Sequence, residues 1–126
     1  MAFDAEVDGH HLRLDTGAEG GGQGLGPRPK PLLLVAAAGC TGMDIASLLK
    51  KMRVEVAGFG MEVEGDLTED HPKTYSAIRL VYTFRGKDLD RAKIEKAVEL
   101  SQDRYCGVSA LLRKAIPFSY RIEYAE

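Results

Sequence analysis

Residues 32–44 read LLLVAAAGCTGMD, an almost unbroken apolar run that continues into a helix-forming stretch ending at Met52. We interpret 32–52 as one long helix. Its first half is apolar on nearly all sides, and a helix of that kind is buried at the centre of a structure. Gly39 and Gly42 each weaken a helix by roughly 1 kcal/mol relative to alanine. Their positions beside Cys40 therefore predict close approach by another backbone, or room for a substrate.

The segments on either side of this helix predict an α+β fold. Alternating apolar and polar residues or short apolar runs indicate strands over 3–7, 12–15, 54–67, 74–84 and 118–124, the third being a strand pair or one long bent strand. Two more helices are expected, one capped by Asp88 and ending near Leu100, the other over 108–115. The predicted order is ββα-ββ-αα-β, without the repeated βαβ pattern of a parallel sheet.

Length and composition are those of a single soluble domain spanning 1–126. A net charge of −2, from 17 basic and 19 acidic residues, indicates neither a nucleic-acid surface nor an anionic membrane as partner. Within 16–26 there are six glycines, and prolines follow at 27, 29 and 31. We therefore expect a flexible Gly/Pro-rich loop at 16–31.

Residues 28–40 have a superficial likeness to a secretory or lipoprotein signal, with basic residues, an apolar run and then Ala-Gly-Cys. We reject that interpretation because the preceding segment is as long as a whole signal peptide and carries five acidic residues. The apolar run is also too short to span a membrane before Asp44 and Lys50. A cytoplasmic protein, with thiols that stay reduced at rest, is the expectation.

Cys40 and Cys106 are the only cysteines, and each lies in a segment of small residues that includes glycine. One interpretation is that both are core fillers, since a buried cysteine is usually a small hydrophobe. The other is redox chemistry, in which one thiolate attacks an oxidant and the other closes a disulfide on the resulting sulfenic acid.

The cysteine segments resemble the OsmC/Ohr family of thiol-dependent hydroperoxide reductases, in its CTGMD-type branch. The matching stretches are 32–44, LLKKMR at 48–53, AVELS at 97–101 and RYCGVS at 104–109, and the resemblance runs from about Gly9 to the C-terminus. It implies an OsmC-like fold in an intertwined homodimer. Two long central helices would pack together there, wrapped by antiparallel sheets from both chains, with each active site at the subunit interface.

The resemblance also implies residue roles. Cys40 would attack a small hydrophobic organic hydroperoxide, Cys106 would resolve the sulfenic acid, and an external dithiol would restore both. An arginine activates the cysteine in this family, and Arg13 is the best-placed candidate, with Arg28 and Arg104 as rivals. A glutamate at the start of the cysteine's helix holds that arginine in the family. Lys30 and Pro31 occupy the corresponding positions here.

Other candidate groups leave the chemistry open. Asp44 is one helical turn beyond Cys40, either as a polar partner or as a packing contact, and an anion there would raise the thiol pKa. His10, His11 and His71 lack ligand-like spacing to either cysteine, so neither a metal nor an organic cofactor is expected. Because the glutamate is missing, the alternative function is a non-catalytic OsmC-like domain that binds a small apolar ligand or senses oxidants.

Overall fold

The computed structural model describes residues 1–126 as two compact units, Met1–Val35 and Ala36–Glu126. In the first unit, β1 (Phe3–Val7) and β2 (His10–Leu14) form an antiparallel hairpin. Asp8 and Gly9 take the positive φ angles, 51° and 75°, that a tight two-residue hairpin turn requires. The predicted hairpin is therefore present, with its second strand beginning earlier than expected.

The glycine-rich segment of this unit is organised around one buried carboxylate. Asp15 accepts hydrogen bonds from the backbone N–H groups of Thr16, Gln23 and Leu25. These donors lower the pKa of Asp15. A short 3₁₀ turn, η1 (Ala18–Gly20), lies within the segment. This role of Asp15 was not anticipated from the sequence.

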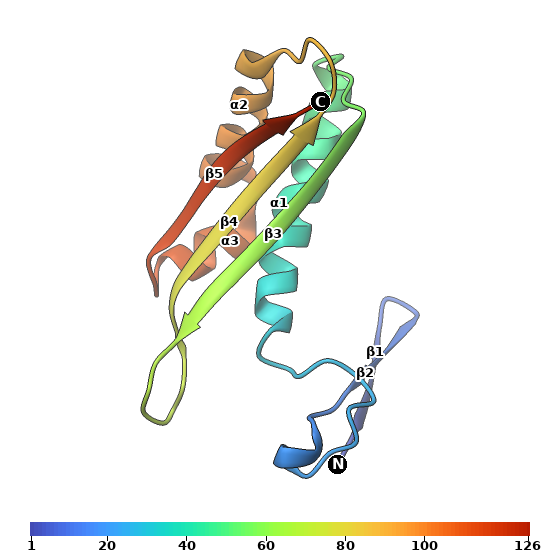
Figure 1. The fold of residues 1–126 in the computed structure, drawn as a ribbon, viewed down its shortest axis with the longest axis vertical. Helices are drawn as coiled ribbons and strands as arrows, with labels where there is room; N and C mark the ends of the chain where they lie inside the picture. Colours follow the sequence, from blue (N-terminus) through green and yellow to red (C-terminus); the bar gives the residue numbers. More distant parts are fainter. The chain divides into compact units, whose positions relative to one another are not determined.

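The second unit is built on a three-stranded sheet in the order β3-β4-β5, with the helices against one of its faces (Figure 1). Its strands are β3 (Gly58–Leu67), β4 (Tyr75–Arg85) and β5 (Phe118–Ala125). Its helical elements are α1 (Leu32–Lys51), which begins in the first unit, α2 (Arg91–Leu100), the π-helical turn η2 (Ser101–Tyr105) and α3 (Gly107–Arg113). The predicted order ββα-ββ-αα-β is confirmed.

The sheet is mixed, whereas we expected antiparallel sheets. Strand β4 pairs with β3 in the antiparallel sense and with β5 in the parallel sense. The chain passes through α2, η2 and α3 between β4 and β5, and a crossover of that length returns it to the same end of the sheet. The segment 54–67 contains one strand, which begins only at Gly58.

The core of this unit lies between β4 and the helices. Alternation along β4 buries Ile78, Leu80, Tyr82 and Phe84, as predicted for one face of this strand. The core cluster comprises Ile45 and Leu49 of α1, Leu80, Tyr82 and Phe84 of β4, and Ile94, Ala97 and Val98 of α2. Burial of a side chain such as Leu49 contributes about 1.5–3 kcal/mol, so this face holds α1 and α2 on the sheet.

The central helix is only partly covered within one chain. A Cβ at Gly42 would meet the end of the Met61 side chain, and one at Gly39 would meet nothing within 4 Å. The predicted close approach of another backbone is therefore not found at either glycine within this chain. Leu33, Val35 and Met43 are 47%, 60% and 78% exposed. The expectation that this stretch is too short to span a membrane was wrong, because α1 is long and apolar enough to cross one. Core helices of soluble proteins and signal sequences near an N-terminus meet the same criterion of length and composition.

The path from α2 to α3 differs from the prediction in two respects. Asp90, rather than Asp88, caps α2, because its carboxylate accepts the N–H of Lys93 while Asp88 lies in a turn with φ 53°. The helix also does not stop at Leu100 but widens into η2. Cys106 then occupies the N-cap of α3, so its place is set by the junction of two helical segments.

Candidate functional site

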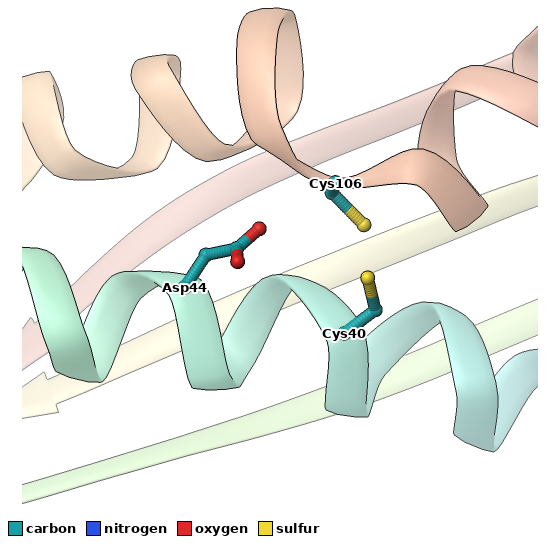
Figure 2. Close-up of side chains that lie close together, drawn as sticks. All are labelled: Cys40, Asp44 and Cys106. Carbon is teal, nitrogen blue, oxygen red and sulfur yellow. The ribbon is translucent and has the colours of Figure 1, made fainter.

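The two cysteines, distant in the sequence, face each other in the fold. Cys40 projects from α1 and Cys106 from the junction of η2 and α3, with their sulfur atoms directed toward one another (Figure 2). Both are free thiols. The two Sγ atoms and one carboxylate oxygen of Asp44 all lie within 4.8 Å of one another. The structure therefore brings together two of the three predicted site residues and adds Asp44.

Backbone hydrogen bonds hold the Cys106 side of the pair. Cys106 is 2% exposed, its N–H donates to the carbonyl of Ser101 at 2.8 Å, and its Sγ accepts the N–H of Ser109 at 3.4 Å. The hydroxyl of Ser109 is buried and has no hydrogen-bond partner. The hydrogen-bonding capacity of this hydroxyl is therefore unused within the chain.

The environment of Cys40 favours the protonated thiol. Burial raises the pKa of Cys40, and its hydrogen-bonding contact with Cys106 raises it further. The N–H of Val108 acts in the opposite direction, while the negative charge of Asp44 adds to the increase. No lysine or arginine is among the groups that shift this pKa. The unit Ala36–Glu126 therefore does not by itself activate Cys40 as a nucleophile.

Asp44 is held by a buried chain of hydrogen bonds that runs between α1, β4 and η2. Ser101 Oγ donates to Asp44 Oδ2 at 3.1 Å, and Ser101 Oγ lies 2.7 Å from Thr41 Oγ1, which lies 2.9 Å from the hydroxyl of Tyr82. Burial raises the pKa of Tyr82, so this hydroxyl remains a donor at neutral pH. Gln102 Nε2 donates to Tyr82 in turn.

The two ends of this hydrogen-bond chain determine the direction in which its members donate. Arg113 can only donate, and its Nη2 lies 2.9 Å from Gln102 Oε1, so the Gln102 amide nitrogen faces Tyr82. A carboxylate can only accept. Each of the three hydroxyls between them therefore donates toward Asp44, and the whole chain orients its carboxylate beside the thiols.

Sequence reasoning missed most of this network. Ser101 directly follows the predicted helix end near Leu100, yet it is fully buried and donates a hydrogen bond to Asp44. The one indication in the sequence was a hydroxyl group at a position predicted to face the core, namely Tyr82 in the alternating pattern of β4. The other unanticipated members are Thr41, Gln102 and Arg113.

The predicted activating arginine lies in the other compact unit. Arg13 of β2 is exposed and forms a two-point ion pair with Asp4 of β1, at 2.7 Å for Nε–Oδ1 and 3.2 Å for Nη2–Oδ2. This pair lowers the pKa of Asp4 and raises that of Arg13. Arg104, one of its rivals, is exposed, with its guanidinium 5.8 Å from the ring centre of Tyr105.

A pocket of about 300 Å³ adjoins the thiol site, lined by Asp44, Ser47, Leu48, Lys51 and Tyr105. Its lining is mixed, with charged and hydroxyl groups beside Leu48 and Tyr105. For metal binding, the only group of three candidate ligands is Cys40, Asp44 and Cys106. The three histidines are exposed and belong to no such group.

Comparison with known proteins finds a matching family model and similar proteins of known sequence. A family model described as OsmC-like protein matches residues 20–121. Protein YhfA of Escherichia coli K12 is 31% identical over 117 residues, which cover 93% of this chain and 84% of the relative.

Solved structures share the fold. A protein of Aquifex aeolicus VF5 aligns with a TM-score of 0.81 and 30% identity, covering 99% of this chain and 89% of the other. An organic hydroperoxide resistance protein OsmC of Legionella pneumophila aligns with a TM-score of 0.69 over 98% and 95% of the two chains. At 20% identity this second match shows the fold alone.

Replacing Asp44 by asparagine should lower the pKa of the Cys40 thiol. Asp44→Asn removes a negative charge that raises this pKa, while the amide oxygen can still accept from Ser101. The pH dependence of iodoacetamide alkylation, measured in a Cys106→Ser background, reports the change. The matched control is Asp70→Asn, an exposed carboxylate in the β3–β4 turn. An alkylation profile that is the same in Asp44→Asn and in the control would contradict this account.

Proposed function

Because the chain belongs to the OsmC-like protein family, we propose that it is a thiol-dependent peroxidase that reduces small hydrophobic organic hydroperoxides in oxidative-stress defence. The observation that carries the proposal is the pair of free thiols of Cys40, on α1, and Cys106, at the start of α3, whose sulfur atoms are directed toward each other. Their sulfur atoms lie within 4.8 Å, so a disulfide with an S–S length of about 2.05 Å needs only local movement.

The proposed cycle has three balanced steps. The Cys40 thiolate attacks the hydroperoxide, the O–O bond breaks, and one proton completes the alcohol, which leaves a sulfenic acid on Cys40. The Cys106 thiol then attacks that sulfur, forming the disulfide and releasing water. An external dithiol exchanges with the disulfide and becomes oxidised itself, restoring both thiols. The first steps require reduced cysteines at rest, which is the condition of the cytoplasm.

Cys40 is the better candidate for the attacking thiol. It is half-buried, whereas Cys106 is 2% exposed, so an incoming hydroperoxide reaches Cys40 more readily. Cys106 has only to reach a sulfenic acid already formed beside it. The roles implied by the family resemblance therefore agree with the accessibility of the two sulfur atoms.

One observation favours the alternative of a non-catalytic domain that binds a small apolar ligand or senses oxidants. Burial, Cys106 and Asp44 all raise the pKa of Cys40, so little thiolate is present at neutral pH unless a positively charged group approaches the sulfur. Stopped-flow reaction of the reduced, metal-free protein with an alkyl hydroperoxide separates the two functions. Thiol loss no faster than that of a free thiol would select the alternative.

The two cysteines should respond differently to substitution. Cys40→Ser should abolish hydroperoxide consumption because it removes the attacking sulfur. Cys106→Ser should permit a single turnover and then stop, since no thiol remains to resolve the sulfenic acid. Mass spectrometry should find an intrachain Cys40–Cys106 disulfide after one equivalent of hydroperoxide, and a trappable Cys40 sulfenic acid in Cys106→Ser. Overoxidised Cys40 beside a reduced Cys106 in the unsubstituted chain would reject the resolving role.

We further propose that Arg13 supplies the positive charge that Cys40 lacks, with Asp4 taking the place of the family's glutamate. The two-point ion pair between Arg13 and Asp4 supports this proposal, because a carboxylate that grips a guanidinium at two atoms fixes its direction. Lys30 and Pro31, at the positions expected for the glutamate, offer no such carboxylate.

Loss of Arg13 should therefore slow the first chemical step. Arg13→Ala is expected to raise the pKa of Cys40 and reduce the rate of sulfenic acid formation, because a nearby cation favours the thiolate. Asp4→Asn, which keeps an acceptor but removes the charge, should have a smaller effect in the same direction. Arg28→Ala and Arg104→Ala are the matched controls. An unchanged thiol titration in Arg13→Ala would transfer the activating role elsewhere.

We also propose that two copies of the chain form a homodimer around α1. Leu33, Val35 and Met43 support it, because a helix with large apolar side chains exposed along its length needs a cover. A second copy presents the same helix and hence the same apolar surface, as an isologous interface requires.

Sedimentation should distinguish this face from the rest of the surface. The unsubstituted chain is expected to sediment as a dimer at micromolar concentration without detergent, and Met43→Arg as a monomer because it places a charge in the interface. Leu111→Arg is the matched control, since Leu111 is 68% exposed on α3. A well-folded monomer of the unsubstituted chain, or its recovery only in detergent, would remove the homodimer.

A further inference from the structure

Three potential metal ligands converge at the thiol site. The sulfur atoms of Cys40 and Cys106 and a carboxylate oxygen of Asp44 lie within 4.8 Å of one another (Figure 2). In a tetrahedral zinc site, metal–ligand bonds of about 2.0–2.3 Å place neighbouring ligand atoms about 3.5–3.8 Å apart. Small side-chain rotations would therefore bring these three groups onto one ion.

The backbone holds the three groups in place before any ion arrives. Cys40 and Asp44 are four residues apart on α1 and so share one face of the helix. Cys106 is fixed by its own N–H bond to Ser101 and by the N–H of Ser109 on its sulfur. Asp44 also lines a pocket with Lys51 and Tyr105, so its carboxylate is not enclosed on every side.

The hydrogen-bond chain from Arg113 to Asp44 supplies an independent argument. Metal-binding carboxylates are characteristically oriented by hydrogen bonds from a second layer of side chains. Ser101 donates to one oxygen of Asp44, Oδ2, and is itself held by Thr41. A carboxylate fixed in this way, beside two thiols, has the arrangement of a metal ligand rather than that of a surface acid.

The charges at the site point the same way. Two thiols and a carboxylate converge within 4.8 Å, and no lysine or arginine is among the groups that act on Cys40; the nearby Lys51 lines the pocket on the side of Asp44. A carboxylate beside a thiol raises the thiol pKa and so opposes formation of a nucleophilic thiolate. The same carboxylate beside two thiolate ligands adds negative charge that stabilises a divalent cation. Thiolate sulfur selects zinc over magnesium or calcium, which prefer oxygen.

We propose that Cys40, Asp44 and Cys106 of the reduced chain bind a zinc ion, with water as the fourth ligand. The site requires the folded chain, because Cys106 comes from a different element than Cys40 and Asp44. It does not depend on the proposed peroxidase activity, since it needs only the reduced thiols. Histidine plays no part in it.

Metal titration of the reduced, anaerobic protein tests the site. Cobalt(II) should give the intense visible bands of tetrahedral coordination together with thiolate-to-metal absorption in the near ultraviolet, at one ion per chain. Zinc should displace it, and competition with a chromophoric chelator gives the zinc affinity. Cys40→Ser and Cys106→Ser should lose the thiolate absorption in part and bind zinc more weakly.

Variants of the carboxylate and its support sharpen the test. Asp44→Asn should weaken zinc binding by at least about tenfold, and Ser101→Ala, which removes the second-layer donor, by about 10–100-fold. Asp70→Asn is the matched control and should bind like the unsubstituted chain. Circular dichroism monitors folding, and alkylation of both thiols in the unsubstituted protein provides a second route to removing the ligands.

Two results would overturn the site. One is an octahedral cobalt spectrum without thiolate absorption, with zinc affinity unchanged after alkylation, which assigns binding to surface histidines. The other is equal zinc affinity in Asp44→Asn and the unsubstituted chain, which removes Asp44 as a ligand. The titrations contain no hydroperoxide, so their outcome does not depend on whether the chain is an active peroxidase. Failure of the zinc site and failure of the proposed peroxidase activity can therefore be distinguished.

Discussion

The hydrogen bonds that Thr41 makes with Tyr82 and Ser101 are the constraint on which the rest of the site depends. They join α1, β4 and η2 inside an otherwise apolar core. A buried hydroxyl left without a partner costs about 1–3 kcal/mol. If α1 rotated or slid on the sheet, several hydroxyls would lose their partners and each would carry this cost. Cys40 directly precedes Thr41, and Cys106 directly follows η2. The contact between the two thiols is therefore a consequence of this polar cluster.

The π-helical turn η2 supplies the other half of the geometry. An α-helix continued through Ser101–Tyr105 would carry the chain onward along the axis of α2. The wider turn instead buries Ser101 and Gln102 toward α1 and delivers Cys106 to the start of α3. Such turns occur frequently at functional sites, where one extra residue redirects a side chain.

The electrostatics of the site separate its two proposed uses. A peroxidatic cysteine needs a positive charge nearby, yet the unit Ala36–Glu126 presents Cys40 with burial and the carboxylate of Asp44. Arg13, gripped by Asp4, is a candidate source of that charge from the other unit. A bound zinc ion would supply positive charge too, but as a competitor, because it occupies the same sulfur atoms. Asp44 thus opposes one chemistry and suits the other.

The sequence by itself determined the element order, the apolar face of β4 and the length of α1, and it singled out both cysteines as candidate site residues. These features follow from periodicity, turn residues and residue type, which act over a few positions along the chain. Sequence patterns misplaced the cap of α2, because Asp88 and Asp90 are equally suitable by type and only the turn geometry selects between them.

Only the tertiary structure decided that β5 runs parallel to β4, that Asp15 organises the glycine-rich segment, and that Asp44 stands beside both thiols. It also joined Arg113, Gln102, Tyr82, Thr41 and Ser101 into one directed chain. Each of these features is a contact between side chains or strands whose partners are distant in the sequence. No periodicity within a single segment records which distant group it will meet, since that is set by how the apolar faces pack.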